Sequence, residues 1–442
     1  MSKLTPARSL ALDVIAQVDA RDAFAANLID TIVRTSDASQ QDKDFAELLV
    51  YGAISTSGTL DELIDRNLSS PKDVRPNVRR ALRISAYEML FLGKADHAVV
   101  DQGVELVRSV APRAAGLGNA VLRKMALDAK GFPWGDPTND DAAAARLYGF
   151  PEWLAKRLMA DLGREGAIAF MDASNRQAPI FIACNYLKTG FPELLESLAA
   201  QGVEPKPYGC IGCIRAGNRK AAVDCDALKD GRAQVTDASA QRAALEATPL
   251  PGRRFLEIGS GKGTKTILMQ SHAKRVNGEQ AELYSLDVHE FKLDVLEGRI
   301  GRFGVEDVRM LVGDATNLES IEGIPESFGK VLIDAPCSGI GTLRRHPEIR
   351  WKVTPETIAS LAAIGSRMLA SAARLIEPGG SIVYSTCTPM CEEDEDVVEA
   401  FLSSELGQRF DIVELDGQRF LKNELEPNGP DVHFIAKLDR VR

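Results

Sequence analysis

The chain has 442 residues, of which 45% are hydrophobic and 26% charged, and its formal net charge is −10. This length is enough for about two or three globular domains, and the acidic balance argues against an indiscriminate coat for nucleic acid. No stretch approaches the ~18 consecutive apolar residues of a membrane helix, and the N-terminal stretch is too charged for a secretory signal, so we expect a cytoplasmic protein without membrane segments.

Apolar residues recur at helical spacing through the first ~130 residues, with few alternating segments between them. Within this region Arg75, Arg79, Arg80 and Arg83 fall on one helix face, which could be solvated or could contact RNA phosphates. The pattern predicts an all-α domain with helices at 7–18, 23–33, 43–55, 60–67, 75–92, 97–109 and 116–129.

The segment GFPWGDPTNDD (131–141) interrupts the helical pattern with Gly, Pro and Asp and predicts a linker. Helices at 151–162 and 165–173 precede a strand-like run, PIFIACN (179–185). A helix at 191–201 and short β-like pieces follow as far as Val235, which predicts a small α+β region. We expect domains at 1–135, 136–232 and 233–442.

From Arg253 onward, short apolar strands alternate with helices: FLEI, LYSLDV, VRMLVGD, KVLIDAP, SIVYSTC, FDIVEL and HFIAKLD. This rhythm predicts an α/β domain with a mostly parallel, seven-stranded sheet that is covered on both faces. Ligands in such sheets bind at the carboxyl ends of the strands, so a site is expected there.

The first of these strands runs into EIGSGKGTKT (257–266), which lacks the G-x-x-x-x-G-K-[S/T] spacing of a phosphate-binding loop. It does carry an acid followed by three alternate glycines, which allow a tight turn and close approach of a ligand. Asp287 ends the next strand, where it could accept both ribose hydroxyls, and Asp314 ends the third, near an adenine edge. Together these residues indicate an adenosine with its ribose.

The seven cysteines are an odd number scattered over a long chain, which favours reduced thiols over a disulfide framework. Cys210 and Cys213 form a Cys-x-x-Cys pair, but no second pair follows at zinc-ribbon spacing, and Cys184 and Cys225 are only loosely placed. We therefore expect no metal site.

Cys337 and Cys387 follow the fourth and fifth strands, at the edge where the cofactor is expected. An isolated cysteine is usually a buried small hydrophobe, but two at matching strand ends beside Asp334 favour chemistry. Methylation of carbon 5 of a pyrimidine suits this arrangement, because that carbon is a poor nucleophile until a thiolate adds to carbon 6. Asp334 could stabilise the charge that develops on the base, and the second cysteine could assist elimination.

DAPCSGIGTLRRHPEIRW (334–351) and YSTC (384–387) closely resemble the two signature motifs of the Sun (RsmB) family of RNA cytosine-5 methyltransferases. The stretch VTDASAQRAALEAT (235–248) resembles the family's element before the sheet. The resemblance covers nearly the whole chain and implies a Rossmann-like methyltransferase domain that uses S-adenosylmethionine (SAM), behind a NusB-like helical RNA-binding domain. It further implies that Cys387 attacks the base, that Cys337 aids product release, and that SAM is bound among Gly259, Ser260, Gly261, Lys262, Gly263, Thr264, Lys265, Asp287, Asp314 and Asp334.

The sequence departs from the family pattern at a few positions. Lys262 replaces a proline and Thr264 a glycine in the first loop, while Lys265 still matches. PIFIACN keeps Asn185 but lacks the family's arginine. Cys391 matches no family position, and we interpret it as a spectator thiol.

A charged stretch follows each of the two cysteines, Cys337 and Cys387. Arg344, Arg345 and His346 follow the Cys337 turn, where we favour contact with RNA over a solvated loop. The acidic run EEDED (392–396) is expected to open a helix, because carboxylates suit the positive end of the helix dipole.

The expected function is SAM-dependent methylation of cytosine carbon 5 in RNA, with 16S ribosomal RNA as the favoured substrate because of the helical domain; no obligate protein partner is evident. A non-catalytic RNA-binding assembly factor, and a methyltransferase of tRNA or large-subunit RNA, stay open as alternatives. A DNA cytosine-5 methyltransferase would use Cys337 as nucleophile. YSTC and the absence of a recognisable DNA-target domain weigh against it.

Overall fold

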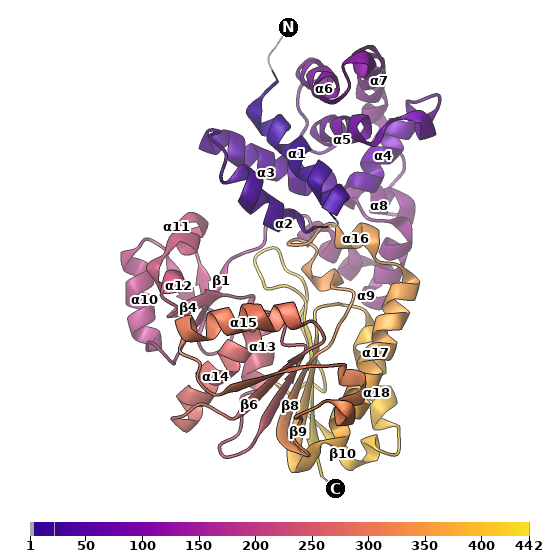
Figure 1. The fold of residues 1–442 in the computed structure, drawn as a ribbon. Helices are drawn as coiled ribbons and strands as arrows, with labels where there is room; N and C mark the ends of the chain where they lie inside the picture. The colour runs from indigo at the N-terminus through magenta and orange to yellow at the C-terminus, as the bar shows by residue number, and fades with distance from the viewer. Residues whose placement is uncertain (1–3, 22, 442) are drawn as a thin grey trace. The chain divides into compact units, whose positions relative to one another are not determined.

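The computed structural model describes residues 4–21 and 23–441 and divides the chain into two compact units. The first unit runs to Gln177 and includes Leu343–Lys352, whereas the second comprises Ala178–Thr342 and Val353–Arg442. Figure 1 shows the helices of the first unit and the sheets of the second.

The first unit begins with the consecutive helices that the sequence predicts, so the all-α character of this region is confirmed. Their apolar faces meet in one core, where Leu49, Leu63 and Leu106 are fully buried. The helix predicted at 23–33 is an α-helical turn followed by a π-helical one. The bounds are α1 Pro6–Arg21, α2 Ala25–Leu28, η1 Ile29–Val33, α3 Gln40–Ser55, α4 Ser57–Arg66, η2 Pro71–Asp73, α5 Pro76–Leu90, α6 Asp96–Val110, η3 Pro112–Ala114, α7 Ala115–Asp128 and η4 Ala129–Gly131.

Arginines on α5 pair with carboxylates of neighbouring helices. Arg79 contacts Asp61 and Asp65 at 3.3 and 2.7 Å, and Arg83 contacts Asp61 at 2.6 Å. Arg80 lies 2.7 Å from an acid of α1. Because these side chains already have anionic partners, the arginine face of this helix fits a role in tying helices together better than one in binding RNA phosphates.

Two later helices, α8 (Asp141–Tyr148) and α9 (Glu152–Ala173), also belong to the first unit. Helix α8 was not predicted from the sequence, and it follows directly on the predicted linker. Asp140 caps its N-terminus, where Oδ1 accepts from Ala142 N at 2.9 Å. Helix α9 contains a break at Gly163, where φ is 72° and ψ is 164°. The break agrees with the two helices predicted at 151–162 and 165–173.

The segment Leu343–Lys352, which contains α16 (Ile349–Lys352), joins the first unit from the middle of the second. Arg350 is fully buried and donates to Gly149 O at 3.2 Å. Trp351 donates from Nε1 to a backbone oxygen of α3 at 2.7 Å. The last part of the predicted signature motif therefore packs within the helical unit, which its spacing could not predict.

The second unit opens with a four-stranded antiparallel sheet of order β2-β3-β1-β4. Strand β1 lies within the predicted PIFIACN run, and the helix predicted at 191–201 is α10, so the small α+β region is present. The bounds are β1 Phe181–Cys184, α10 Phe191–Ala200, β2 Pro205–Pro207, β3 Cys213–Ala216, α11 Arg219–Asp224, α12 Asp226–Lys229 and β4 Ala233–Val235.

The large sheet has the order β10-β12-β9-β8-β5-β6-β7, with the two-residue β11 paired to β12 beside this path. Strands β5 to β9 pair in parallel, and β12 is antiparallel to its neighbours, which confirms the mostly parallel sheet of seven strands, with β11 as an addition. The strand order reverses at β5, the point where open α/β sheets bind ligands. The bounds are β5 Phe255–Ile258, β6 Leu283–Asp287, β7 Val308–Val312, β8 Phe328–Asp334, β9 Ile376–Thr386, β10 Phe410–Val413, β11 Leu421–Lys422 and β12 Phe434–Arg440.

Helices cover both faces of this sheet (Figure 1). Val331 and Ile333 of β8 pack in one core with Leu369 of α17, whereas Leu332 packs in the other with Leu268 of α14. Because both faces are buried, the strands are continuous apolar runs without alternation. The helix bounds are α13 Ala238–Glu246, α14 Thr264–Asn277, α15 Glu290–Phe303, η5 Ala315–Ser320, η6 Ile340–Thr342, α17 Pro355–Arg374, η7 Cys391–Glu393, α18 Glu395–Leu402 and η8 Gly407–Arg409.

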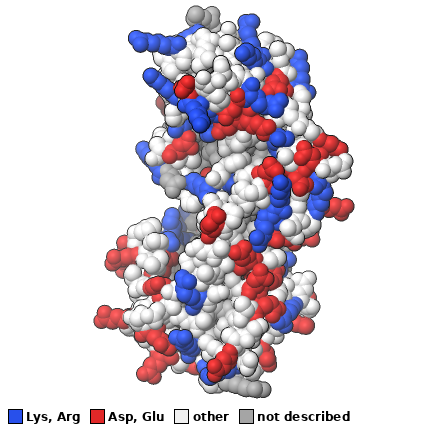
Figure 2. Space-filling model, turned by 90° about the vertical axis from the view of Figure 1, so that its right-hand side faces the viewer, with Lys and Arg blue, Asp and Glu red and all other residues white. Residues whose placement is uncertain are grey.

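Acidic and basic side chains are interspersed over the face drawn in Figure 2. Among the helices of the described residues, none combines the length and the apolar character needed to cross a membrane.

Candidate active site

The glycine loop Gly259–Gly263 connects β5 to α14 at the carboxyl edge of the large sheet. Its three glycines have φ of 78°, 55° and 79°, values that side chains rarely allow. A Cβ on Gly259 would lie 2.4 Å from Asp334 O, and one on Gly263 would lie 2.1 Å from Leu296 Cδ1, whereas the nearest atom to a Cβ on Gly261 would be 4.0 Å away. The loop thus packs tightly at both ends and is open to a ligand in its middle.

The other predicted loop residues have different surroundings. Ser260 is buried, and its N–H donates to Leu286 O at 3.1 Å. Lys262, which replaces the family's proline, is exposed, and Thr264 is the first residue of α14. The two departures from the family pattern therefore lie where the loop meets solvent and where the helix begins.

Gly263→Ala is expected to weaken SAM binding by at least about 10-fold, because the new methyl group collides with Leu296 and displaces the loop. Calorimetric titration with SAM measures this effect. Gly278→Ala is the matched control, since Gly278 also has a φ of 79° but would present its methyl group to open space. Both variants pay the backbone cost of about 1 kcal/mol, so equal affinities would contradict the expectation.

Asp287 follows the second strand of the domain and holds the glycine loop. Its Oδ2 accepts from Gly261 N at 3.0 Å, and its Oδ1 accepts from His289 N at 2.9 Å. Lys292 Nζ is a third partner, 3.2 Å from Oδ1 and 3.3 Å from Oδ2. A carboxylate has about four acceptor positions, so about one remains for a ribose hydroxyl unless Lys292 is displaced. Asp314 is exposed and accepts from Thr316 N at 2.9 Å, a hydrogen bond that lowers the pKa of Asp314.

Lys265 and Asp334 form an ion pair at the end of β8, with Nζ 2.7 Å from Oδ2. Burial opposes the charge on Lys265, but Asp334 and then Cys387 raise the pKa of Lys265 above its ordinary value. The loop lysine, the aspartate and the cysteine thus form one electrostatic group, in which Lys265 remains a cation. The sequence motifs place Lys265 and Asp334 at one site but do not predict that the two side chains pair.

Cys337 and Cys387 lie side by side although 50 residues separate them in the chain. Their Sγ atoms are 3.3 Å apart, and Cys387 N donates to Cys337 Sγ at 3.2 Å. Both side chains are half-buried. The hydrogen bond with Cys387 and then burial raise the pKa of Cys337 well above its ordinary value, so Cys337 remains a protonated thiol at neutral pH.

Glu257, the acid before the glycine loop, is buried beneath it. Thr266 Oγ1 donates to its Oε2, and Ser285 Oγ donates to the same atom at 3.2 Å. Burial raises the pKa of Glu257 to about 8, against the effect of these hydrogen bonds. At pH 7 the carboxyl group is therefore mostly protonated and supports the loop from below.

This raised pKa predicts a pH-dependent stability. The folded state keeps a proton on Glu257 that the unfolded state loses, so its contribution is full below about pH 4.5 and is lost as pH rises through 8. Relative to Glu257→Gln, the wild type should lose about 1.4 kcal/mol of unfolding free energy per pH unit between these limits. Hydrogen exchange of the strand amides measures it. Parallel pH profiles would contradict the expectation, and the exposed Glu319→Gln should follow the wild type.

His433 is a site residue that the sequence analysis missed, since a lone histidine before a strand carries no signal. It precedes Phe434, which is the ladder partner of Thr386, and so it lies beside Cys387. Burial and then Lys265 lower the pKa of His433 to about 4, so the imidazole is neutral at pH 7.

Two predicted substrate contacts have other surroundings in the structure. Arg344 belongs to the helical unit and is buried, which does not suit a phosphate contact; Arg345 and His346 are half-buried. Asn185 is also buried, and its Nδ2 donates to Gly231 O and Phe303 O, both at 2.8 Å. The preference for RNA contact at these arginines is therefore not supported for Arg344.

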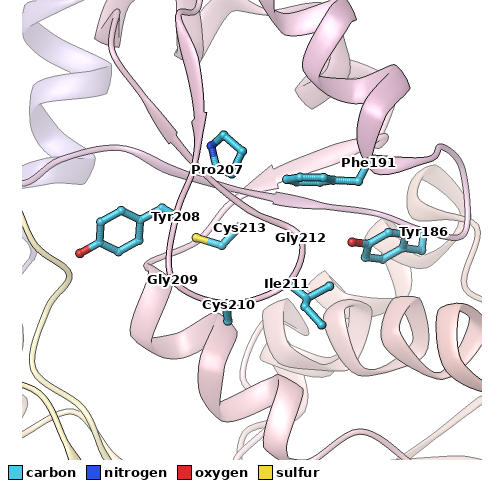
Figure 3. Close-up of a pocket in the computed structure, with 9 residues that line it drawn as sticks. All are labelled: Tyr186, Phe191, Pro207, Tyr208, Gly209, Cys210, Ile211, Gly212 and Cys213. Atoms are coloured by element: carbon cyan, nitrogen blue, oxygen red, sulfur yellow. The ribbon is translucent and has the colours of Figure 1, made fainter.

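The Cys210–Cys213 turn lies in the small α+β region and lines a cavity of about 430 Å³ (Figure 3). Tyr208 lies on one side of the turn, and Tyr186 and Phe191 lie on the other. The hydrogen bond between the two thiols lowers the pKa of Cys210 and raises that of Cys213. Within the described part of the chain, no group of three or more His, Cys, Asp or Glu side chains is arranged to hold a metal ion.

The strand order, the glycine loop after β5 and the acids after the next two strands define a Rossmann-like, SAM-dependent methyltransferase. Residues 244–439 match the family described as 16S rRNA methyltransferase RsmB/F, residues 5–127 the NusB family, and residues 150–215 the RsmF/B-like ferredoxin-like domain. The chain belongs to the RsmB family of ribosomal RNA small subunit methyltransferases.

Relatives of this chain match it over most of their length. Ribosomal RNA small subunit methyltransferase B of Thermus thermophilus is 33% identical over 98% of both chains. A probable ribosomal RNA small subunit methyltransferase B of Synechocystis is 29% identical over 90% of this chain and 89% of its own. The resemblance that the two cysteine motifs indicated is thus confirmed.

Solved structures share the fold. The crystal structure of PH0851 covers 100% of both chains with a TM-score of 0.81 at 23% sequence identity. NSun6 from Pyrococcus horikoshii, crystallised with the SAM analogue SFG, covers 67% of this chain and 100% of its own with a TM-score of 0.59 at 17% identity.

Proposed function

We propose that this protein transfers a methyl group from SAM to carbon 5 of a cytosine in 16S ribosomal RNA through a covalent bond to Cys387. The observation that carries the proposal is the 3.3 Å approach of Cys337 Sγ and Cys387 Sγ beside the Lys265–Asp334 pair. Family membership supports the small-subunit substrate, because the relatives are named for that activity.

The two thiols have different tasks in this proposal. The Cys387 thiolate adds to carbon 6 of the base, and carbon 5 then takes the methyl group while the sulfonium sulfur keeps the electron pair of the broken bond. Water takes the proton from carbon 5, the electron pair of that C–H bond re-forms the 5,6 double bond, and the Cys387 thiolate leaves carbon 6 with the electron pair of the C–S bond. Cys337, a protonated thiol in contact with Cys387, can give its proton to the departing sulfur.

Lys265 stabilises the negative charge that develops on the base when the thiolate adds, and Asp334 orients the base. Asp334 could accept from the exocyclic amine of cytosine, and the ammonium of Lys265 holds the carboxylate in place at 2.7 Å. The neutral ring of His433 adds no competing charge to this group. These groups lie at the edge of the sheet, so a base must be turned out of its stack to reach them.

The SAM site is proposed at the glycine loop, Ser260 to Lys265, with Asp287 on the ribose and Asp314 near the adenine. The residues fit the group, since Gly261 faces open space and the Asp287 carboxylate beside it has about one acceptor position left next to Gly261 N, His289 N and Lys292 Nζ. When bound, SAM supplies an electrophilic methyl group. We also propose that residues 1–135 and 136–232 are domains that bind RNA and that 233–442 is the catalytic domain.

The test is transfer of labelled methyl groups from SAM to isolated 16S rRNA and to small-subunit particles, followed by mapping of 5-methylcytosine. A single modified cytosine in 16S rRNA is the expected result. Methylation of tRNA or large-subunit RNA instead would replace the proposed substrate, and absence of 5-methylcytosine from all RNAs, with SAM bound, would overturn the activity.

A further inference from the structure

The carboxylate of Glu393 is buried directly behind the two cysteine turns, with 1% of the residue exposed. Its Oε1 accepts from Ser338 N at 2.6 Å, and its Oε2 accepts from Ser338 Oγ, also at 2.6 Å. Ser338 directly follows Cys337 in the chain. The Glu393 carboxylate thus accepts from both hydrogen-bond donors of Ser338, its backbone N–H and its hydroxyl group.

The same hydrogen-bond network reaches the second cysteine. Ser338 Oγ and Thr388 Oγ1 lie 2.9 Å apart, and Thr388 directly follows Cys387. The backbone of Glu393 is fixed as well, because Tyr384 Oη donates to its carbonyl oxygen at 3.0 Å. The two turns come from different strands, β8 and β9, and this network joins them immediately behind the sulfur atoms.

Burying a carboxylate costs free energy unless its oxygen atoms accept hydrogen bonds, and here each oxygen accepts one from Ser338. Burial raises the pKa of Glu393, which those hydrogen bonds oppose. An apolar side chain could fill the same space without this cost, but it could not hold Ser338 at a fixed distance and direction. The network therefore contributes more to fixing the positions of the two cysteine turns than to the free energy of folding.

We propose that Glu393 is a positioning residue that sets the distance between Cys337 and Cys387 and so makes proton transfer between their sulfur atoms possible. The inference rests on the proposed function. Glu393 acts through Ser338 and Thr388, and the hydrogen bond that it sets is the 3.3 Å sulfur–sulfur contact. Misplacement of a reacting group by about 1 Å typically costs about 10²-fold in rate.

The first test replaces Glu393 by Leu, which removes both oxygen atoms that accept hydrogen bonds from Ser338. Turnover of rRNA is expected to fall about 10²-fold, with the affinities for SAM and RNA unchanged and with a covalent protein–RNA adduct that persists. Glu395→Leu is the matched control, because that neighbouring carboxylate pairs with Lys422 at 3.0 Å. Equal turnover of the Glu393 variant and the wild type would overturn the proposal.

A second measurement needs no RNA. The azo oxidant diamide joins two thiols into a disulfide and is itself reduced to a hydrazine, so the rate of the Cys337–Cys387 bond reports how well the two sulfurs are aligned. Glu393→Leu is expected to slow formation of this bond at least about 10-fold, and Glu395→Leu to leave its rate unchanged. If the wild type methylates no RNA, the proposed function fails while this measurement still judges the positioning role.

Ser338→Ala guards against a Glu393 variant that fails to fold. It removes the bonds to Glu393 Oε2 and Thr388 but keeps the Ser338 N–H bond to Oε1, so it should slow disulfide formation in the same direction. Wild-type disulfide rates in this variant and in any folded Glu393 variant would overturn the inference.

Discussion

Cys387→Ala is expected to abolish methyl transfer to RNA. Carbon 5 of cytosine becomes nucleophilic only after a thiolate has added to carbon 6. Cys337 is a poor substitute for Cys387, because burial still raises the pKa of Cys337 after the hydrogen bond with Cys387 is lost. Incorporation of labelled methyl groups into 16S rRNA should fall by more than about 10⁴-fold. SAM affinity, measured by calorimetry, should be unchanged because the glycine loop is intact.

Cys391→Ala is the control for the loss of Cys387. Cys391 lies four residues further along the chain and, like Cys387, is half-buried, so it tests whether any thiol near β9 matters. It should keep wild-type turnover within a few-fold. If Cys387→Ala kept more than a small fraction of the activity, the covalent step would be wrong.

Cys337→Ala is expected to retain addition to the base but to lose product release. The thiol of Cys337 lies 3.3 Å from Cys387 Sγ, where it can protonate the departing sulfur; without it, the bond between Cys387 and carbon 6 persists. The variant should therefore accumulate a protein–RNA adduct that survives denaturing electrophoresis and should turn over at most once per active site. The adduct should contain a methylated base.

The double variant of Cys337 and Cys387 provides the control, because it should form no adduct. The opposite pattern in the single variants, an adduct from Cys387→Ala and none from Cys337→Ala, would reverse the two roles. It would also bring the reaction closer to that of a DNA cytosine-5 methyltransferase, which the sequence analysis kept as an alternative.

The local elements of both units could be predicted because each carries its own signal. Helices such as α3, Gln40–Ser55, and α6, Asp96–Val110, follow the apolar period of 3.6 residues. The strands of the large sheet are short apolar runs between turn residues, and their chain order with helices between them dictates parallel pairing. Motif positions at strand ends then located Gly259, Asp287, Asp334 and the two cysteines at one edge.

The acidic run EEDED shows where local reasoning stops. The prediction that it opens a helix is correct for α18, which starts at Glu395. Glu393 and Asp394 are buried instead, and burial raises the pKa of Asp394 to about 8 against its pairing with Lys422. The spacing of the five acidic residues does not show which of them face solvent and which are buried next to the cysteine turns.

The helical N-terminal region, the strands with their chain order, and the residues that end each strand could be predicted from the sequence, because periodicity and strand-end motifs involve only neighbouring residues. Tertiary structure alone decided the contact of two sulfurs 50 residues apart, the pairing of Lys265 with Asp334, and the placing of Leu343–Lys352 in the helical unit. These contacts join residues that are distant in the chain, and their distances depend on how both partners pack against everything between them.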